Sequence, residues 1–467
     1  MTAAETGTRK ANLGEGALGP LLFRYALPGV IAMLASALYN IVDQVFIGNG
    51  IGVHGNAATN VAFPLTTLCT AVALLLGNGA AANFNLTMGA GKKQQAAKIA
   101  GNAVTLLLLL GIFLCIGVRI FLEPLMHLFG ATPDVLDYAL TYTGITSFGF
   151  PFVILATGGS ALIRSDGSPR YSMACMLSGA VINTILDPLL IFQFNMGMAG
   201  AALATVLGQA VSGVMALAYL LRFRSVKLQK GDFALSARSC GRIARLGTSD
   251  FLNQLAMMLV QIVLNNTMTY YGARSLYGKE IPLACAGIIS KAGMIFFAII
   301  IGISQGMQPI AGFNYGAKKY RRVMQAYRLG ITAASVISVC GFLCFQLFPR
   351  QIIALFGSGS DVYFQFAERY FRIYMFATFL NGIQPITSKF FSSIGKAPKG
   401  IFLALTRQFL FLLPLILILP LFGGIEGVMF AGPIADTVAA LFSLLFIYWE
   451  FRRLRLLDQN KPAAGAR

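Results

Sequence analysis

A carboxylate lies in the middle of an apolar run long enough to enter a membrane. Asp187 occupies this position in the sequence VINTILDPLLIF, which covers residues 181–192. A charge in hydrocarbon is unfavourable by about 3 kcal/mol even on lenient insertion scales, so an ionisable residue there indicates a functional site. The alternative is a proline kink whose Asp is neutral or hydrogen-bonded to neighbouring helices.

Two neighbours of Asp187 could act with it. Asn183 lies four residues earlier and therefore on the same helical face. Pro188 has no N–H group, so the carbonyl oxygen of Thr184 is left free to act as a ligand. One helical turn thus offers a carboxylate, an amide and a bare carbonyl.

A second carboxylate, Asp43, lies in LYNIVDQVFIG toward the outer end of the first predicted membrane span. The span that carries Asp187 runs in the same direction, so side-by-side packing would bring the two residues together. Two carboxylates that are close in a medium of low dielectric constant cannot both ionise cheaply. They would hold a proton or share a cation.

The elements that position these residues are membrane helices. The chain has 467 residues, is 57% hydrophobic and 11% charged, and has a mean hydropathy of +0.72. This composition indicates an all-α protein with many membrane spans. Apolar runs of spanning length predict twelve helices, which begin near Leu27, Ala57, Ile99, Tyr138, Tyr171, Ala199, Phe251, Leu283, Leu329, Phe366, Ile401 and Gly427.

The net charge of +19 reflects the orientation of the chain. Most of the 36 Lys and Arg residues fall in segments that alternate assignment puts on the inner side. We therefore expect a multi-pass protein of the bacterial plasma membrane with both termini in the cytoplasm. A cysteine at Asn56 should label from outside and one at Gln229 only from inside. Nucleic acid is not an expected partner; we expect a monomer in the lipid bilayer that meets small amphipathic substrates.

The chain divides into two halves that repeat each other. We assign a tail at 1–20, an N-terminal lobe at 21–221, a cytoplasmic linker at 222–245, a C-terminal lobe at 246–450 and a second tail at 451–467. Leu128-Phe129-Gly130 recurs as Leu355-Phe356-Gly357, and other loop motifs keep the same register. Because each half has an even number of spans, the repeats are parallel, and such bundles enclose a cavity that opens to alternate sides.

The acidic chemistry belongs to the first half. In the repeat, Asp187 aligns with Leu413, and Asp43 falls near Leu264. An ion-coupling site in the first lobe alone is therefore expected.

Further charged residues within predicted spans could belong to the coupling site or the cavity. Lys291 could pair with a carboxylate across the cavity or extend its ammonium group to the membrane surface. Asp436 aligns with Gln209, so a packing role is about as well supported as a functional one. Arg407 is expected to anchor its helix at the inner surface.

At these residues the sequence resembles the MATE family, the multidrug and toxic compound extrusion transporters, and most closely its DinF branch with MepA-type proteins. The resemblance covers nearly the whole chain. It rests on YNIVDQVFIG around Asp43, RSDGSPRYSM at 164–173, INTILDP at 182–188 and GAALAT at 200–205. It implies a MATE-type fold of the MOP superfamily with two six-helix repeats.

The resemblance also implies functional residues. Relatives of this branch have a cation site in the first lobe, matched here by Asp43, Asn183, Asp187 and Thr205, which could bind Na⁺ or a proton. Tyr142 in LTYTGI resembles a nearby tyrosine of that site. Other branches use acidic residues in the seventh and tenth spans, which Asp250 and Glu368 match imperfectly.

These observations predict a secondary antiporter without a cofactor, in which H⁺ or Na⁺ enters through Asp43 and Asp187. Its entry would drive the release of an amphipathic, often cationic compound by alternating access. An enzyme is not expected, since the two histidines, His54 and His127, lie in predicted outer loops and form no acid–base or metal constellation with the intramembrane residues.

Two alternatives remain. A lipid-linked oligosaccharide flippase would need a strongly cationic central cavity, for which the candidates are Lys291, Arg369, Arg372 and Arg407. A membrane receptor or scaffold would have no reason to keep an Asp–Asn cluster in one half of a repeat.

Overall fold

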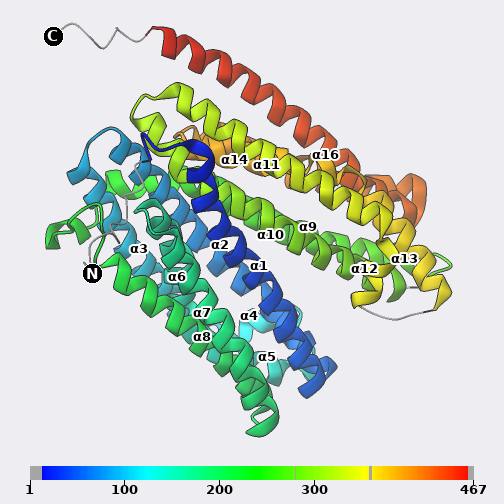
Figure 1. The fold of residues 1–467 in the computed structure, drawn as a ribbon. Helices are drawn as coiled ribbons and strands as arrows, with labels where there is room; N and C mark the ends of the chain where they lie inside the picture. Colours follow the sequence, from blue (N-terminus) through cyan, green and yellow to red (C-terminus); the bar gives the residue numbers. More distant parts are fainter. Residues whose placement is uncertain (1–12, 279, 357–359, 461–467) are drawn as a thin grey trace, which may run out of the picture.

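The computed structural model describes residues 13–278, 280–356 and 360–460, and within these ranges the chain is helical with no β-strand (Figure 1). Residues 1–12 and 461–467 of the two predicted tails lie outside the described residues, as does Gly357 of the repeated motif.

Six helical passes form the first half. A 3₁₀ turn at Ser147–Gly149 joins two helices of one pass, and a π-helical turn at Leu189–Gln193 follows Pro188. The helices are α1 (Leu18–Gly50), α2 (Val53–Gly89), α3 (Lys93–Ile120), α4 (Leu122–Leu128), α5 (Pro133–Thr146), α6 (Phe150–Ser165), α7 (Pro169–Pro188) and α8 (Gly197–Leu220).

The second half repeats this order, irregular turns included. A 3₁₀ turn at Phe376–Leu380 again divides one pass. A π-helical turn at Thr406–Leu412 again lies beside a proline, Pro414, which aligns with Pro188 in the repeat. The helices are α9 (Ala237–Gly272), α10 (Glu280–Gly316), α11 (Tyr320–Leu347), α12 (Pro349–Phe356), α13 (Asp361–Tyr374), α14 (Ile383–Ser393), α15 (Ala397–Leu405) and α16 (Leu413–Gln459). The predicted pair of six-helix repeats is confirmed.

The described residues form the twelve passes that the sequence predicts. Nine helical stretches are long and apolar enough to cross a membrane. One of these, Ala397–Gln459, holds two passes that meet at Gly424, where φ is 57° and ψ is −142°. Of the two remaining passes, α9 carries many polar residues, and the other is divided into α13 and α14, whose 14 and 11 residues are each too few to span a membrane alone.

Each half has a hydrophobic core of its own, but the boundary between the halves differs from the assigned one. The first turns of α1, including Leu22 and Tyr25, pack in the core of the second half. Helix α9 begins at Ala237, inside the predicted linker, and α16 continues to Gln459, inside the predicted tail.

The two bundles form a V. Figure 1 shows them joined where α1 begins and α16 ends, and spread apart toward α4 and α5 on one side and α12 and α13 on the other. At the joined end α1 packs against α10, and α2 packs against α9. Glycine permits this approach, because a Cβ at Gly247 would lie 1.8 Å from the carbonyl oxygen of Leu75.

Candidate functional site

The predicted acidic cluster is assembled by helices of the first half. Asp43 lies on α1, and Asn183 and Asp187 lie on α7, which packs against α1. Thr205 comes from α8 and Tyr142 from α5, and α8 packs against both α7 and α5. The structure therefore brings together all five residues, although they span more than a quarter of the chain.

The contacts within the cluster connect amide, hydroxyl and carboxyl groups. The Nδ2 atom of Asn183 lies 3.4 Å from Oδ1 of Asp187 and 3.4 Å from Oγ1 of Thr205. The carboxyl groups of Asp43 and Asp187 face each other closely enough for a hydrogen bond when one of them carries a proton. The hydroxyl of Tyr142 lies beside Thr205.

Three oxygen atoms of this cluster are buried without a hydrogen-bond partner among the described residues. They are Oδ1 of Asp43, Oδ1 of Asn183 and Oδ2 of Asp187. The side chain of Asp187 is completely buried. Buried polar atoms normally have partners. Oxygen donors of this kind suit a proton or a hard cation such as Na⁺, so the residues present fit the predicted ion.

The sequence did not single out Tyr39, which also belongs to this site. Tyr39 lies near both Asp43 and Asp187 and lines the same cavity as Asp43. It precedes Asp43 by four residues in LYNIVD, so the helical period could have placed it on the same face.

A cavity of about 440 Å³ connects the cluster with the second half. Asp43, Tyr142 and Thr205 line it, as do Gln254 of α9 and Gln305 of α10. A second cavity of about 200 Å³ adjoins it, since both share Leu74, Asn78, Gln254, Ile301 and Gln305 as lining residues. Together they form one central cavity between the lobes.

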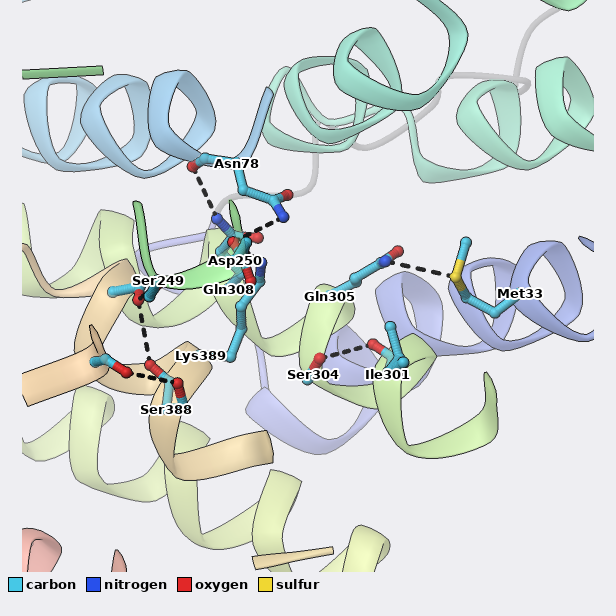
Figure 2. Close-up of polar contacts among 12 residues, drawn as sticks. Met33, Asn78, Ser249, Asp250, Ile301, Ser304, Gln305, Gln308, Ser388 and Lys389 are labelled. Carbon is cyan, nitrogen blue, oxygen red and sulfur yellow. Dashed lines mark hydrogen bonds and ion pairs between the residues drawn. The ribbon is translucent and has the colours of Figure 1, made fainter. Parts of the chain in front are cut away.

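Beside this cavity an ion pair of the second lobe is hydrogen-bonded to the first lobe (Figure 2). Asp250 of α9 accepts hydrogen bonds from Lys389 of α14 and from the amide of Asn78 of α2, both at 2.9 Å. Gln308 donates to the carbonyl oxygen of Asn78 at 3.3 Å. Asp250 is therefore held by a cation of its own lobe and an amide of the other lobe.

The structure keeps the other predicted candidates away from the acidic cluster. Asp436 pairs with Arg407 at 2.5 Å in the second half, where the side chain of Asp436 is 2% exposed and that of Arg407 is 14% exposed. The expectation that Arg407 anchors its helix at the inner surface is therefore wrong. Lys291 is half-buried on α10 and forms no hydrogen bond or ion pair within the described ranges. Glu368 lies 3.7 Å from Arg350.

Comparison with known proteins places these observations in context. The family model described as MatE matches residues 28–189 and 252–418, one segment in each half. The multidrug export protein MepA of Staphylococcus saprophyticus is 24% identical over 428 residues, which cover 91% of this chain and 93% of the relative. MepA of Staphylococcus haemolyticus is 25% identical over 445 residues, covering 94% and 95%.

Solved structures show the same fold. An outward-facing multidrug resistance MATE family transporter of the MOP superfamily superimposes with a TM-score of 0.89 at 24% identity, covering 96% of this chain and 99% of that one. A MOP superfamily transporter from Pyrococcus furiosus, reported to have a binding pocket of reverse polarity, gives a TM-score of 0.88 at 24% identity with the same coverage.

Proposed function

Because this chain belongs to the MatE family, we propose that it is a secondary active multidrug exporter of the cell membrane. Inward movement of H⁺ or Na⁺ through the acidic cluster drives the outward release of amphipathic, often cationic compounds by alternating access. The staphylococcal relatives, which are named multidrug export proteins, support this function.

The observation that carries the proposal is the set of buried oxygens without partners on Asp43, Asn183 and Asp187. A proton or Na⁺ would give these atoms a partner and would reduce the repulsion between the two carboxylates. Ion binding would then favour the packing of α1 against α7, and ion release would weaken it.

Helix α1 would carry this signal to the interface between the lobes. Asp43 lies toward one end of α1, and Gly29 lies toward the other end, where its Cβ would be 3.0 Å from the carbonyl oxygen of Gly302 on α10. A movement of α1 at the ion site therefore changes the contact that holds the lobes together. In our proposal the joined end faces the cytoplasm, in accord with the basic residues of the inner segments.

The cavity charges argue against the flippase. Three of its four cationic candidates, Lys291, Arg369 and Arg372, do not line the central cavity described above. The fourth, Arg407, lines it but is paired with Asp436. Lys389 also lines it and is paired with Asp250, so Arg164 is the one lining cation without an acidic partner among the described residues. A pyrophosphate needs several free positive charges, and the cavity offers it one.

Transport in proteoliposomes tests the proposal, with efflux measured under a pH gradient alone and under a Na⁺ gradient alone. We expect Asp187→Asn and Asp43→Asn each to abolish gradient-driven efflux, because Asn keeps the shape but cannot change its charge. The double variant should be little worse than either single one, since the two residues act as a unit.

Asp137→Asn is the matched control, because Asp137 is exposed on α5 outside the cavity and undergoes the same chemical change. Asp436→Asn is unsuitable, since it would leave Arg407 without its partner. Gradient-driven efflux at the wild-type rate in both Asp187→Asn and Asp43→Asn, at equal incorporation, would refute the assigned coupling site.

A further inference from the structure

One buried cation of the central cavity has no role in the ion-coupling scheme. Arg164 lies in the last turn of α6, is only 5% exposed, and contributes to the lining of the larger cavity. Arg164 lies in one of the segments that the alternate assignment of spans puts on the inner side of the membrane. In the structure it lines the cavity instead, at the floor, which is the end toward the joined end of the two bundles.

The guanidinium group of Arg164 lacks an acidic partner among the described residues. Its one hydrogen bond runs from Nη1 to Oγ of Ser172 at 3.2 Å, although a guanidinium group has five N–H donors. Asp166, two residues further on, is occupied elsewhere, since it accepts hydrogen bonds from Tyr219 and from Ser225. Asp250 is taken by the lobe-spanning contacts described above.

The surroundings of Arg164 are basic and offer further polar atoms. Lys389 of the opposite lobe is close enough to interact electrostatically with Arg164, and Asp250 neutralises only one of these two cations. Ser160 Oγ and Gln305 Oε1 line the same cavity, and both are buried without a hydrogen-bond partner in the described part of the chain. A buried cation without a counter-charge is costly, so the site is suited to an anionic group.

We propose that Arg164, with Lys389 opposite, forms a subsite for the carboxylate of an amphiphilic substrate. A guanidinium group presents a planar pair of donors that matches a carboxylate in bidentate geometry. The cavity lining follows α2 from Thr59 to Asn78, which corresponds to about 28 Å of helix, so the floor is remote from the cavity mouth. The inference rests on the proposed export function and extends its substrates from cations to zwitterions and organic acids.

The test compares two fluorescent dyes that differ in one group. Tetramethylrhodamine has a free carboxylate, and its methyl ester does not. Binding of each dye to the detergent-purified full chain is measured by fluorescence polarisation. We expect wild type to bind the acid about tenfold more tightly than the ester, because charge-assisted hydrogen bonds form only with the acid.

Substitutions of Arg164 test whether this residue causes the preference for the acid. Arg164→Gln should abolish the preference for the acid while the ester binds as before, and Arg164→Lys should retain part of the preference. Arg238→Gln is the control, since Arg238 is exposed at the start of α9, away from the cavity. The unchanged ester affinity shows that Arg164→Gln is folded.

Two results would overturn the subsite. One is an equal affinity of wild type for acid and ester, or no binding of either dye. The other is displacement of the dyes by dioctanoyl phosphatidic acid in an Arg164-dependent manner without any preference for the acid dye, which would assign the cation to a lipid phosphate. Failure of the export function gives a different result, namely Arg164-dependent binding of the acid without transport in proteoliposomes.

Discussion

The two halves of the molecule treat their buried carboxylates in opposite ways. Asp187 keeps an oxygen atom without a partner, and it faces the second carboxylate, Asp43. Asp436 instead is bound to Arg407. The guanidinium group also lies over the ring of Phe297, at 5.2 Å from its centroid. One lobe therefore has a carboxyl pair that can accept an ion, and the other has a charge pair that is already neutral.

The Asp436–Arg407 pair should stabilise the fold. Asp436→Asn removes one partner of a buried pair and should lower the free energy of unfolding by about 3 kcal/mol. The double variant Asp436→Asn with Arg407→Gln should lose much less than the sum of the two single variants. Thermal unfolding in detergent measures this coupling.

The exposed pair Arg369–Glu426 provides the control for this measurement. Its side chains are 55% and 42% exposed, and breaking it should cost about 0–1 kcal/mol. Additive losses at Asp436 and Arg407 would show that the two residues do not stabilise each other.

The sequence could predict the acidic cluster but not the basic residues of the cavity. The helical period and the direction of the spans bring Asp43, Asn183 and Asp187 together, and the structure does so as well. Sequence could not separate Arg164 and Lys389 from interfacial residues, because both lie within a few turns of a helix end. An error of one helical turn in a predicted boundary moves such a residue from the membrane surface into the cavity.

At the scale of elements, the break in α16 depends on one glycine. The sequence predicts separate helices that begin near Ile401 and Gly427, and the structure joins them through Gly424. The φ of 57° and ψ of −142° at Gly424 lie in a region that residues with a Cβ rarely adopt. The turn between the eleventh and twelfth passes is therefore specified by the absence of a side chain.

Gly424→Ala should lower the thermal stability of the protein, because the strained backbone costs of order 1–3 kcal/mol. Gly423→Ala is the neighbouring control, since a Cβ there meets nothing within 4 Å and its φ is not positive. Equal melting temperatures of the two variants would mean that the turn relaxes without cost.

Most of the element order could be read from the sequence, but its irregular parts could not. Apolar runs give the twelve passes, whereas the 3₁₀ turns at 147–149 and 376–380 leave no mark in hydrophobicity. The sequence predicts that the seventh pass begins near Phe251, because the first turns of α9 are polar and have the hydropathy of a loop. In the structure α9 begins at Ala237.

The orientation of the whole molecule remains a prediction that surface labelling can test. Asn56 is a poor position for a probe, because its amide packs against Gly48. Val53 is 83% exposed in the same turn and replaces it. With the exposed Cys340 and Cys344 changed to Ser, we expect Val53→Cys to label from outside and Gln229→Cys only after permeabilisation. The reverse pattern would invert the assigned topology.

The glycine contacts at the joined end should control which way the molecule opens. Gly247→Ala forces a methyl group against the backbone of Leu75, with no flexible side chain that could move away. We expect it to push the lobes apart at the joined end and to bring their opposite ends, at the mouth of the cavity, closer together. Spin labels at Leu128 and Leu355, which are exposed on α4 and α12, would report a shorter distance by electron double resonance.

Gly241→Ala, on the same helix α9, meets nothing within 4 Å and should leave the distance distribution unchanged. An unaltered distance in Gly247→Ala as well would show that the joined end tolerates the methyl group without rotation of the lobes.

The position of another close contact, between Gly29 of α1 and Gly302 of α10, has a mechanical consequence. Helix α1 has 33 residues and is about 50 Å long, and its close approach to α10, at Gly29, lies in its first half. About 30 Å of α1 therefore extends beyond the contact as a lever arm toward the mouth. A rotation of α1 about this contact therefore moves its far end about twice as far as its near end, because the arm before the contact is only about 16 Å long.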